Sequence, residues 1–491
     1  MALFRVSNER AQFDAAGNDA RDQYGAGIRF TQGGNARVTT GSPTNYNQGI
    51  PMSSTGQVAI VDATAGLPAG TIFHNGLPIS GDKVCVSRNA TAVVSNGMPY
   101  DAAGAVAGDI NFDLNFIGTN TLNSAITFTR ASSATFVGSN GLIQSATTNT
   151  PRFDYDPVTL AAKGLLIEEQ RTNLLTYSEQ FDNAAWVNNG GTVTANALVA
   201  PDGSTTADYL VRSTSSVDGR YQVITAGTSG VVTASAYIKK DTSPQSLIWL
   251  YDATAVAERI FATVTWSGST PVVTATTGTA ATPQDAGNGW WRIAITSTAL
   301  TGANTNRLYL LPAYTAASNG QQTAFWGAQL EQGAFSTSYI PTVASQVTRS
   351  ADVALINTLS PWFNSAQGTL YAEYSAATSN RYIFAIKGAA YTTDQILLWT
   401  NGAYTNPDGL LSNTNLAAKR AISYEVNNLS MSTNGGAVAS DTSVTNGWSG
   451  AATAVLGASD STGGSCMNGY IRRITYYPRR LSNAELQAIT A

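Results

Sequence analysis

Acidic side chains that could act on a sugar substrate are sparse in this 491-residue chain. A polysaccharide hydrolase needs two carboxylates that face each other across a groove. The best candidate segment, Tyr371-Ala-Glu-Tyr-Ser375, supplies a single carboxylate, Glu373. We therefore expect Glu373 to be a strand residue that faces solvent or pairs with a neighbouring charge.

A second acidic group, Glu168-Glu169, is followed closely by Arg171. Such a group could be a metal site or a catalytic pair. However, no histidine lies near it in the sequence, and its spacing matches no oxygen-ligand loop such as the EF-hand. The pattern favours the end of a strand that makes surface or interface ion pairs.

Nucleophilic and cofactor chemistry also lack the residues that they need. The single histidine, His74, precedes an Asn-Gly turn, where a hydrogen-bonded turn residue is the simpler interpretation. The sequence has no glycine-rich phosphate loop followed by lysine and no clustered Cys/His spacing. We expect no catalytic residue, no metal, no cofactor and no enzyme activity.

Aromatic side chains are the remaining candidates for sugar binding. Their faces stack on sugar rings, while amide and carboxylate groups hydrogen-bond the sugar hydroxyls. Most tryptophans should be core residues. Adjacent Trp290 and Trp291 must point to opposite faces of a strand, so one of them should face away from the core. The predicted glycan or subunit contacts are Trp290, Trp291, Trp326 and Trp448, from a pool that also contains Trp249, Trp266, Trp362 and Trp399.

Charge argues against a nucleic-acid partner, because a net charge of −4 provides no broad basic field. We interpret the C-terminal arginines as solvated pairs that flank a strand and a turn rather than as an anion site. These arginines are Arg472, Arg473, Arg479 and Arg480.

Cysteine usage and hydropathy give further expectations. Cys85 and Cys466 are far apart in the sequence, which predicts buried free thiols rather than a disulfide. The N-terminus has no basic segment followed by an apolar stretch, and the sequence has no apolar run of 18 residues. We expect neither a secretory signal nor membrane insertion.

Strand and turn signals dominate the chain. Runs such as 230–238, 247–251 and 291–296 alternate apolar and small polar residues between breakers, as is typical of antiparallel sandwiches. Ser482 and Glu485 form a capping box that predicts one short C-terminal helix. The predicted fold class is therefore all-β: an elongated multidomain chain with two antiparallel β-sandwiches after an irregular β-rich N-terminal region.

The pattern suggests four regions. Residues 1–110 form an N-terminal attachment and assembly region, 111–171 a connector, 172–347 a jelly roll and 348–491 a second sandwich. Within the first region, Asn75-Gly-Leu-Pro78 is echoed by Asn96-Gly-Met-Pro99, which predicts two tight hairpins. We expect contact with partner chains to order this region, because it has little apolar material to bury.

One run carries the most specific signal. Phe128 to Thr135 is Phe-Thr-Arg-Ala-Ser-Ser-Ala-Thr, Asn149 to Pro157 is Asn-Thr-Pro-Arg-Phe-Asp-Tyr-Asp-Pro, and Gly164 to Asn173 is Gly-Leu-Leu-Ile-Glu-Glu-Gln-Arg-Thr-Asn. In this order the segments resemble a module shared by bacteriophage tail and capsid-fibre proteins. More loosely, 288–294 and 326–341 resemble strands of carbohydrate-binding-module-like jelly rolls, and 469–486 resembles a concanavalin A-like, laminin G-type lectin sandwich.

The resemblance implies a non-enzymatic structural component of a phage virion, assembled in the host bacterial cytoplasm. It would be a homotrimeric fibre that docks on other virion proteins through residues 1–110 and displays its sandwiches for adhesion to host-surface glycan. One alternative is a capsid head fibre or decoration protein without a specific receptor. Another is a polysaccharide depolymerase, which would need the paired carboxylates described above.

Overall fold

The computed structural model describes residues 112–491 except 216, 225–226, 315–318, 389–393, 406–408, 413–414 and 443–450. Before residue 112 it describes only short strands. These are β1 (Ala20–Arg21), β2 (Gly27–Phe30), β3 (Ala36–Val38), β4 (Phe73–His74), β5 (Leu77–Pro78), β6 (Val93–Ser95) and β7 (Met98–Tyr100). β4 pairs with β5 and β6 with β7, which confirms the hairpins predicted at the two Asn-Gly steps. Cys85 and the His74 side chain lie outside the described residues.

The C-terminal sandwich consists of two antiparallel sheets. The eight-stranded sheet contains β12 (Arg152–Tyr155), β13 (Ala162–Ile167), β39 (Gly469–Tyr477), β30 (Gly368–Ala376), β35 (Ala417–Glu425), β36 (Asn428–Thr433) and β37 (Ala439–Asp441), and β8 (Phe112–Asn115) also pairs with β39. The seven-stranded sheet contains β34 (Gly409–Ser412), β33 (Gly402–Thr405), β32 (Asp394–Trp399), β31 (Tyr382–Gly388), β38 (Ala451–Leu456), β29 (Val353–Ile356) and β9 (Ile126–Thr129). Buried aliphatic residues such as Leu165, Leu370 and Ile386 form its core.

The other sandwich, residues 174–346, is here called the insert. Its six-stranded sheet contains β15 (Val187–Asn188), β18 (Arg220–Val223), β26 (Asn306–Leu311), β20 (Gln245–Asp252), β21 (Ala257–Ser267) and β22 (Thr270–Thr277). Its seven-stranded sheet contains β16 (Thr192–Leu198), β17 (Ala207–Val211), β27 (Gln322–Gln332), β19 (Val232–Lys239), β25 (Trp290–Thr296), β23 (Thr279–Ala280) and β24 (Gln284–Asp285). Residues such as Ile248, Ile293 and Phe325 fill the space between the sheets.

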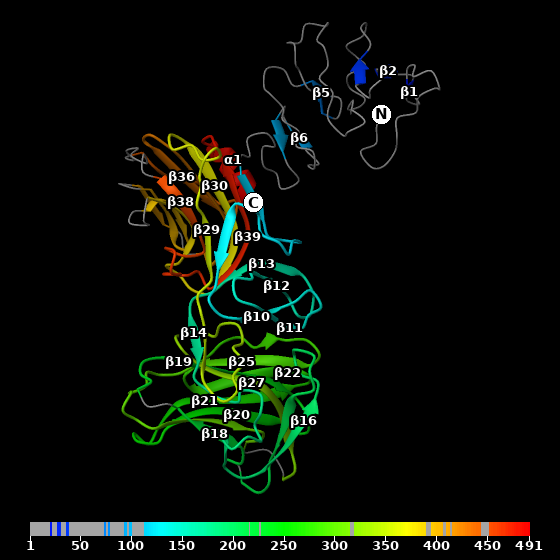
Figure 1. The fold of residues 1–491 in the computed structure, drawn as a ribbon, viewed down its shortest axis with the longest axis vertical. Helices are drawn as coiled ribbons and strands as arrows, with labels where there is room; N and C mark the ends of the chain where they lie inside the picture. The colour runs from blue at the N-terminus through cyan, green and yellow to red at the C-terminus, as the bar shows by residue number, and fades with distance from the viewer. Residues whose placement is uncertain are drawn as a thin grey trace.

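The insert interrupts the C-terminal sandwich. Strands β8, β9, β12 and β13 come before it in the sequence. β8 and β13 hydrogen-bond to β39, and β9 hydrogen-bonds to β29, both of which come after it, while β12 extends the sheet as the partner of β13. The chain leaves through β14 (Arg171–Asn173) and returns through β28 (Val347–Arg349), which pair with each other. A hairpin of β10 (Ala134–Val137) and β11 (Ile143–Ala146) lies with β12 and β13 between the two sandwiches in Figure 1. The sheets therefore extend across the boundaries that the sequence pattern placed at 171 and 348.

The all-β prediction is confirmed, and local patterning explains the strands. β21 alternates buried and more exposed residues, as expected for a strand with one face in a core. The single α-helix of the described residues, α1 (Asn483–Thr490), begins at the predicted capping box, in which Ser482 accepts from the Glu485 amide and Glu485 caps the Ser482 amide. Leu486 and Ile489 bury its apolar face against Tyr371 and Tyr477.

Gly164 gives a test of the pairing between β13 and β39. Its φ is +110°, and a Cβ added there would lie 2.3 Å from the Ile471 carbonyl oxygen of β39. We expect Gly164→Ala to lower the free energy of unfolding by about 3 kcal/mol, because both the backbone and the ladder are strained. Urea denaturation followed by tryptophan fluorescence measures the loss.

Gly118→Ala is the matched control. Gly118 also has a positive φ, +73°, but no atom of the described residues lies within 4 Å of the added Cβ, so only the backbone cost of about 1 kcal/mol remains. Equal losses in the two variants would show that the close approach of β39 is unimportant.

Candidate functional site

The paired strands β14 and β28 form a neck that is fixed to the insert by one amide. The buried Asn173 side chain donates to the carbonyls of Ala328 (3.1 Å) and Ile340 (2.9 Å). Its oxygen accepts from the amides of Leu175 and Leu330, both at 3.1 Å. Because every one of these bonds joins the neck to the insert, the orientation of the neck is set by buried groups without unpaired polar atoms.

Beside the neck lies a buried charge network, defined by Arg130, Arg152, Glu168, Arg349 and Asp352. The contacts are Arg130 Nη1 to Asp352 Oδ1 at 3.0 Å, Arg152 Nη1 to Glu168 Oε2 at 2.8 Å, Arg349 Nη1 to Glu168 Oε2 at 2.8 Å, and Arg152 Nη2 to Asp352 Oδ2. All five side chains are at most 7% exposed. Three guanidinium groups thus surround two carboxylates, with the insert on one side and the C-terminal sandwich on the other.

The insert joins this network through Ser338. The Ser338 amide and hydroxyl each donate to Glu168 at 2.7 Å. Burial alone would raise the pKa of Glu168, but Arg349, Arg152 and the two bonds from Ser338 outweigh it and lower that pKa to about 2. Glu168 is therefore ionised in the folded protein across the ordinary pH range.

The three segments of the most specific sequence run converge here. Arg130 comes from the first segment, Arg152 from the second and Glu168 from the third. Surface or interface ion pairs are the expectation for Glu168, Glu169 and Arg171. Ion pairs are present, since Glu168 pairs with Arg152 and Arg349 and Glu169 pairs with Arg171, but Glu168 is buried rather than on the surface. This run therefore supplies most of the buried charge at the junction of the sandwiches.

Two of the four tryptophans predicted as glycan or subunit contacts, Trp290 and Trp326, are buried. Trp290 and Trp291 do point to opposite faces, since Trp291 packs against the insert core while Trp290 joins a cluster on the outer face of its sheet. That outer cluster is covered by Ile143 of the β10–β11 hairpin and by Tyr339, so Trp290 and Trp326 are each only 1% exposed. Their indole N–H groups donate at 3.0 Å, that of Trp290 to the Val199 carbonyl and that of Trp326 to the Thr206 hydroxyl.

Neither Trp290 nor Trp326 therefore offers a stacking face to a ligand. Trp291 is half-buried against the insert core, so most of its ring is used in packing. Trp448 lies outside the described residues.

An aromatic surface does exist on the other sheet of the insert. Tyr221, Tyr309, Trp249 and Phe261 are direct cross-strand neighbours on β18, β26, β20 and β21. We call these four residues the aromatic row. Successive ring centroids lie 4.7, 4.8 and 6.2 Å apart, and three of the rings are half-buried while Tyr309 is 6% exposed. The row lies on the face of the sheet opposite the insert core.

Polar and aromatic groups border the row. The Tyr251 ring is tilted against Trp249 with the ring centres 5.1 Å apart, and Tyr314 meets Phe261 edge to face at 5.4 Å. The Arg307 guanidinium lies 5.3 Å from the Tyr221 ring centre. The indole N–H of Trp249 is buried without an acceptor in the described part of the chain.

The sequence contained a signal for this row. Leu247, Trp249 and Tyr251 alternate along one strand, so all three lie on one face. The predicted contacts are all tryptophans and include neither Tyr221 nor Tyr309. Register between β20 and β26 places Tyr309 beside Trp249, and register is set by tertiary structure.

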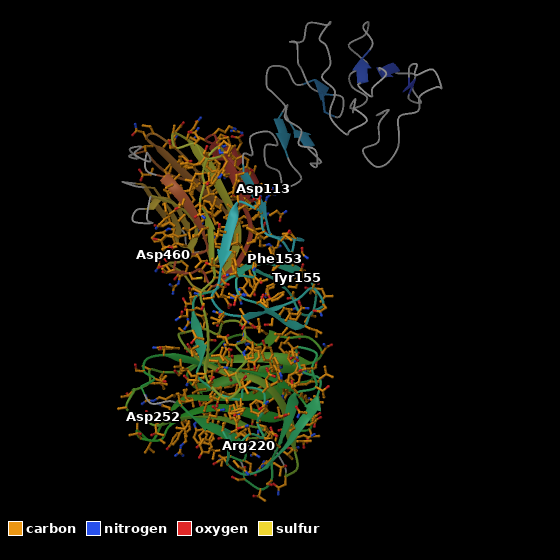
Figure 2. The ribbon with its side chains drawn as sticks, viewed as in Figure 1. Asp113, Phe153, Tyr155, Arg220, Asp252 and Asp460 are labelled. Atoms are coloured by element: carbon orange, nitrogen blue, oxygen red, sulfur yellow. The ribbon has the colours of Figure 1, made fainter. Side chains whose placement is uncertain are left out.

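The other charged candidates make local ion pairs. Glu373 pairs with Arg472 at 2.8 Å, which confirms its expected local pairing. The remaining C-terminal arginines also have carboxylate partners: Arg473 with Asp113, Arg479 with Glu485 and Arg480 with Glu425. Asp113, labelled in Figure 2, thereby ties β8 to β39. These contacts support the structural interpretation of the arginine cluster.

Metal-ligating side chains are not clustered in the described ranges. No three His, Cys, Asp or Glu side chains there are grouped so that they could hold a metal ion. No helix in the same ranges is long and apolar enough to span a membrane. Cys466 is a buried free thiol, as predicted, and burial raises its pKa.

Comparison with known proteins gives weak similarities. No protein-family model and no curated protein matches the sequence. Similar solved structures include a Ruminococcus gnavus IT-sialidase CBM40 bound to alpha2,6 sialyllactose (19% identity, TM-score 0.22, 26% of this chain and 85% of that one). Others are Trypanosoma rangeli sialidase in complex with the inhibitor DANA (8%, 0.23, 68% and 54%) and mouse laminin alpha1 chain domains LG4-5 (8%, 0.17, 59% and 90%). At these TM-scores, nothing about this chain's ligands follows from them.

Removal of Asp352 tests the charge network. We expect Asp352→Ala to lower the free energy of unfolding by about 3–5 kcal/mol, because Arg130 and Arg152 would lose a buried counter-ion. Glu373→Ala breaks the Glu373–Arg472 pair, whose side chains are 29% and 40% exposed, and should cost about 1 kcal/mol or less. Urea denaturation of both variants measures the contrast, and an Asp352→Ala loss as small as the control's would refute the network's role.

Acidification gives a separate test at Glu168. The folded-state pKa, about 2, lies below the ordinary value of 4.5, so the stabilisation is present above pH 4.5 and is lost as pH falls toward 2. Glu168→Gln should be less stable than the parent protein by roughly 3 kcal/mol at pH 7. This difference should shrink when denaturation is measured at pH 4, 3 and 2. A difference that stays constant over that range would contradict the ion-pair explanation.

Proposed function

We propose that this chain is a non-enzymatic adhesion subunit of a bacteriophage particle, and that it binds host-surface glycan through the aromatic row. The row is the observation that carries the proposal. The phage setting is supported by the resemblance of the run from Phe128 to Asn173 to phage tail and capsid-fibre proteins. We further propose that the subunit is a homotrimeric fibre that docks on the virion through residues 1–110.

The geometry of the row suits a sugar chain. Its four strands are neighbours in one sheet, and strands lie about 4.8 Å apart, so the rings extend over about 14 Å. Aromatic faces stack on the apolar faces of sugar rings, and the adjacent Arg307 and tyrosine hydroxyls can bond sugar hydroxyls.

The proposal is non-enzymatic because Glu373, the carboxylate considered for hydrolysis, is paired with Arg472 on the adjacent strand. A depolymerase would require a second carboxylate facing it across a groove. A second rival is a capsid head fibre or decoration protein, in which a second subunit rather than a glycan would cover the aromatic row.

Glycan binding by the full chain and by Trp249→Ala tests the proposal. We expect the parent protein to sediment as a trimer and to bind a subset of bacterial surface glycans on an array. Trp249→Ala should weaken that binding at least fivefold, because stacking on one ring contributes about 1 kcal/mol. Val272→Ala, on β22 of the same sheet and 52% exposed, is the control and should bind like the parent.

The outcomes separate the rivals. A trimer that stays silent on the array, and whose assembly is weakened by Trp249→Ala, would support the decoration protein and contradict the adhesion subunit. Glycan binding that survives Trp249→Ala would remove the aromatic row from the site. Release of free sugar from host polysaccharide would favour the depolymerase.

A further inference from the structure

A cleft lies between the two sandwiches, on the opposite sheet of the insert from the aromatic row. The cleft has a volume of about 630 Å³. Its walls come from the β10–β11 hairpin, the turn between β12 and β13, the outer face of the seven-stranded insert sheet and residues 468–470 of the C-terminal sandwich. The space is therefore large enough for a monosaccharide-sized ligand and is lined by both units.

Arg292 is the unusual residue in this cleft. It lies on β25 in register with Tyr237 of β19, it lines the cleft, and it is 8% exposed. Its Nη2 donates to the Ser235 hydroxyl at 3.1 Å, and its guanidinium lies 5.5 Å from the Tyr237 ring centre. Its Nε has no hydrogen-bond partner, and no carboxylate of the described residues forms an ion pair with it.

The neighbouring arginines show what Arg292 lacks. Arg130, Arg152 and Arg349 are at most 1% exposed, against 8% for Arg292, and each has a carboxylate within hydrogen-bonding distance. A buried guanidinium without a counter-ion is unfavourable unless something else compensates its charge. An anionic ligand in the cleft would provide that compensation, and guanidinium geometry suits a carboxylate held by two parallel bonds.

The rest of the wall restricts the ligand to one negative charge. Four carboxylates, Asp154, Asp156, Glu168 and Asp285, line the cleft against one further cation, Lys163, so a ligand with several acidic groups would be repelled. Asp154 is already engaged by the Val137 amide at 2.6 Å, by the Tyr470 hydroxyl at 2.8 Å and by Lys163 at 3.5 Å. Carboxylates of this kind have further lone pairs that accept bonds from hydroxyl groups.

We propose that this cleft binds a hydroxyl-rich ligand with a single carboxylate, namely an acidic sugar residue, and that Arg292 receives the carboxylate. Tyr237 lies beneath the guanidinium and limits its movement. The site does not depend on the aromatic row, because the two lie on different sheets of the insert. An acidic peptide is the less favourable occupant, since it offers few hydroxyl donors to the acidic wall.

Calorimetric titration of the full chain tests this site with matched probes. The probes are glucuronic acid, galacturonic acid and their methyl esters, which keep every hydroxyl but lose the charge. We expect at least one acid to bind tenfold or more tightly than its ester, because hydrogen bonds to charged groups are the stronger ones. Arg292→Met should abolish this preference, and Arg292→Lys should retain part of it.

Two control variants test whether the loss of acid preference is particular to Arg292. Arg480→Met removes an arginine that pairs with Glu425, and Trp249→Ala removes the centre of the aromatic row; both should retain the preference for the acid. Without ligand, Arg292→Met should melt at the same temperature as the parent or higher, because an unpaired buried charge is removed.

Three outcomes would overturn the proposal. They are equal binding of an acid and its ester by the parent, a preference that survives Arg292→Met, and a lowered melting temperature of ligand-free Arg292→Met. If an acetylated Glu dipeptide binds and neither sugar acid does, the ligand is an acidic peptide and the proposal of an acidic sugar is wrong.

Discussion

The architecture depends on a buried cluster in which two carboxylates compensate three guanidinium groups. Asp352 and Glu168 lie between the sandwiches, and their partners come from segments up to 222 residues apart in the sequence. Buried charges are stable only when all of them are assembled together, because each one left alone bears an uncompensated desolvation cost. The cluster therefore favours one arrangement of the two sandwiches over any looser one, and Ser338 makes that arrangement include the insert.

Residues 111–171 are expected from the sequence to form a connector, but their strands belong to the C-terminal sandwich, and the charge network lies at the end of those strands. Leu165 and Ile167 of β13 are fully buried in the C-terminal core, while Glu168, the next residue, turns into the junction. Residues that are adjacent in the chain thus lie in two places: the apolar ones in the core of the C-terminal sandwich and the charged one at the junction with the insert. The charged ones set the position of the insert, and the apolar ones complete the sheet with β39.

Local features could be predicted from the sequence, while long-range ones could not. The capping box at Ser482, the hairpins at Asn75 and Asn96 and the opposed faces of Trp290 and Trp291 depend on residues close together in the chain. The burial of Trp290 depends on Ile143, almost 150 residues earlier, and no periodicity reports that contact. The aromatic row and the unpaired Arg292 likewise depend on register and on neighbours that only the folded chain brings together.

The paired strands of the neck make the insert a unit that evolution can gain, lose or replace. The insert is joined to the rest of the chain by two paired strands, so its two ends lie side by side at Asn173 and Val347. A module whose ends are adjacent can be lost, gained or replaced without separating the strands on either side of it. The C-terminal sandwich can therefore carry different inserted domains at this position. Each inserted domain would need a hydroxyl group at the place where Ser338 bonds Glu168.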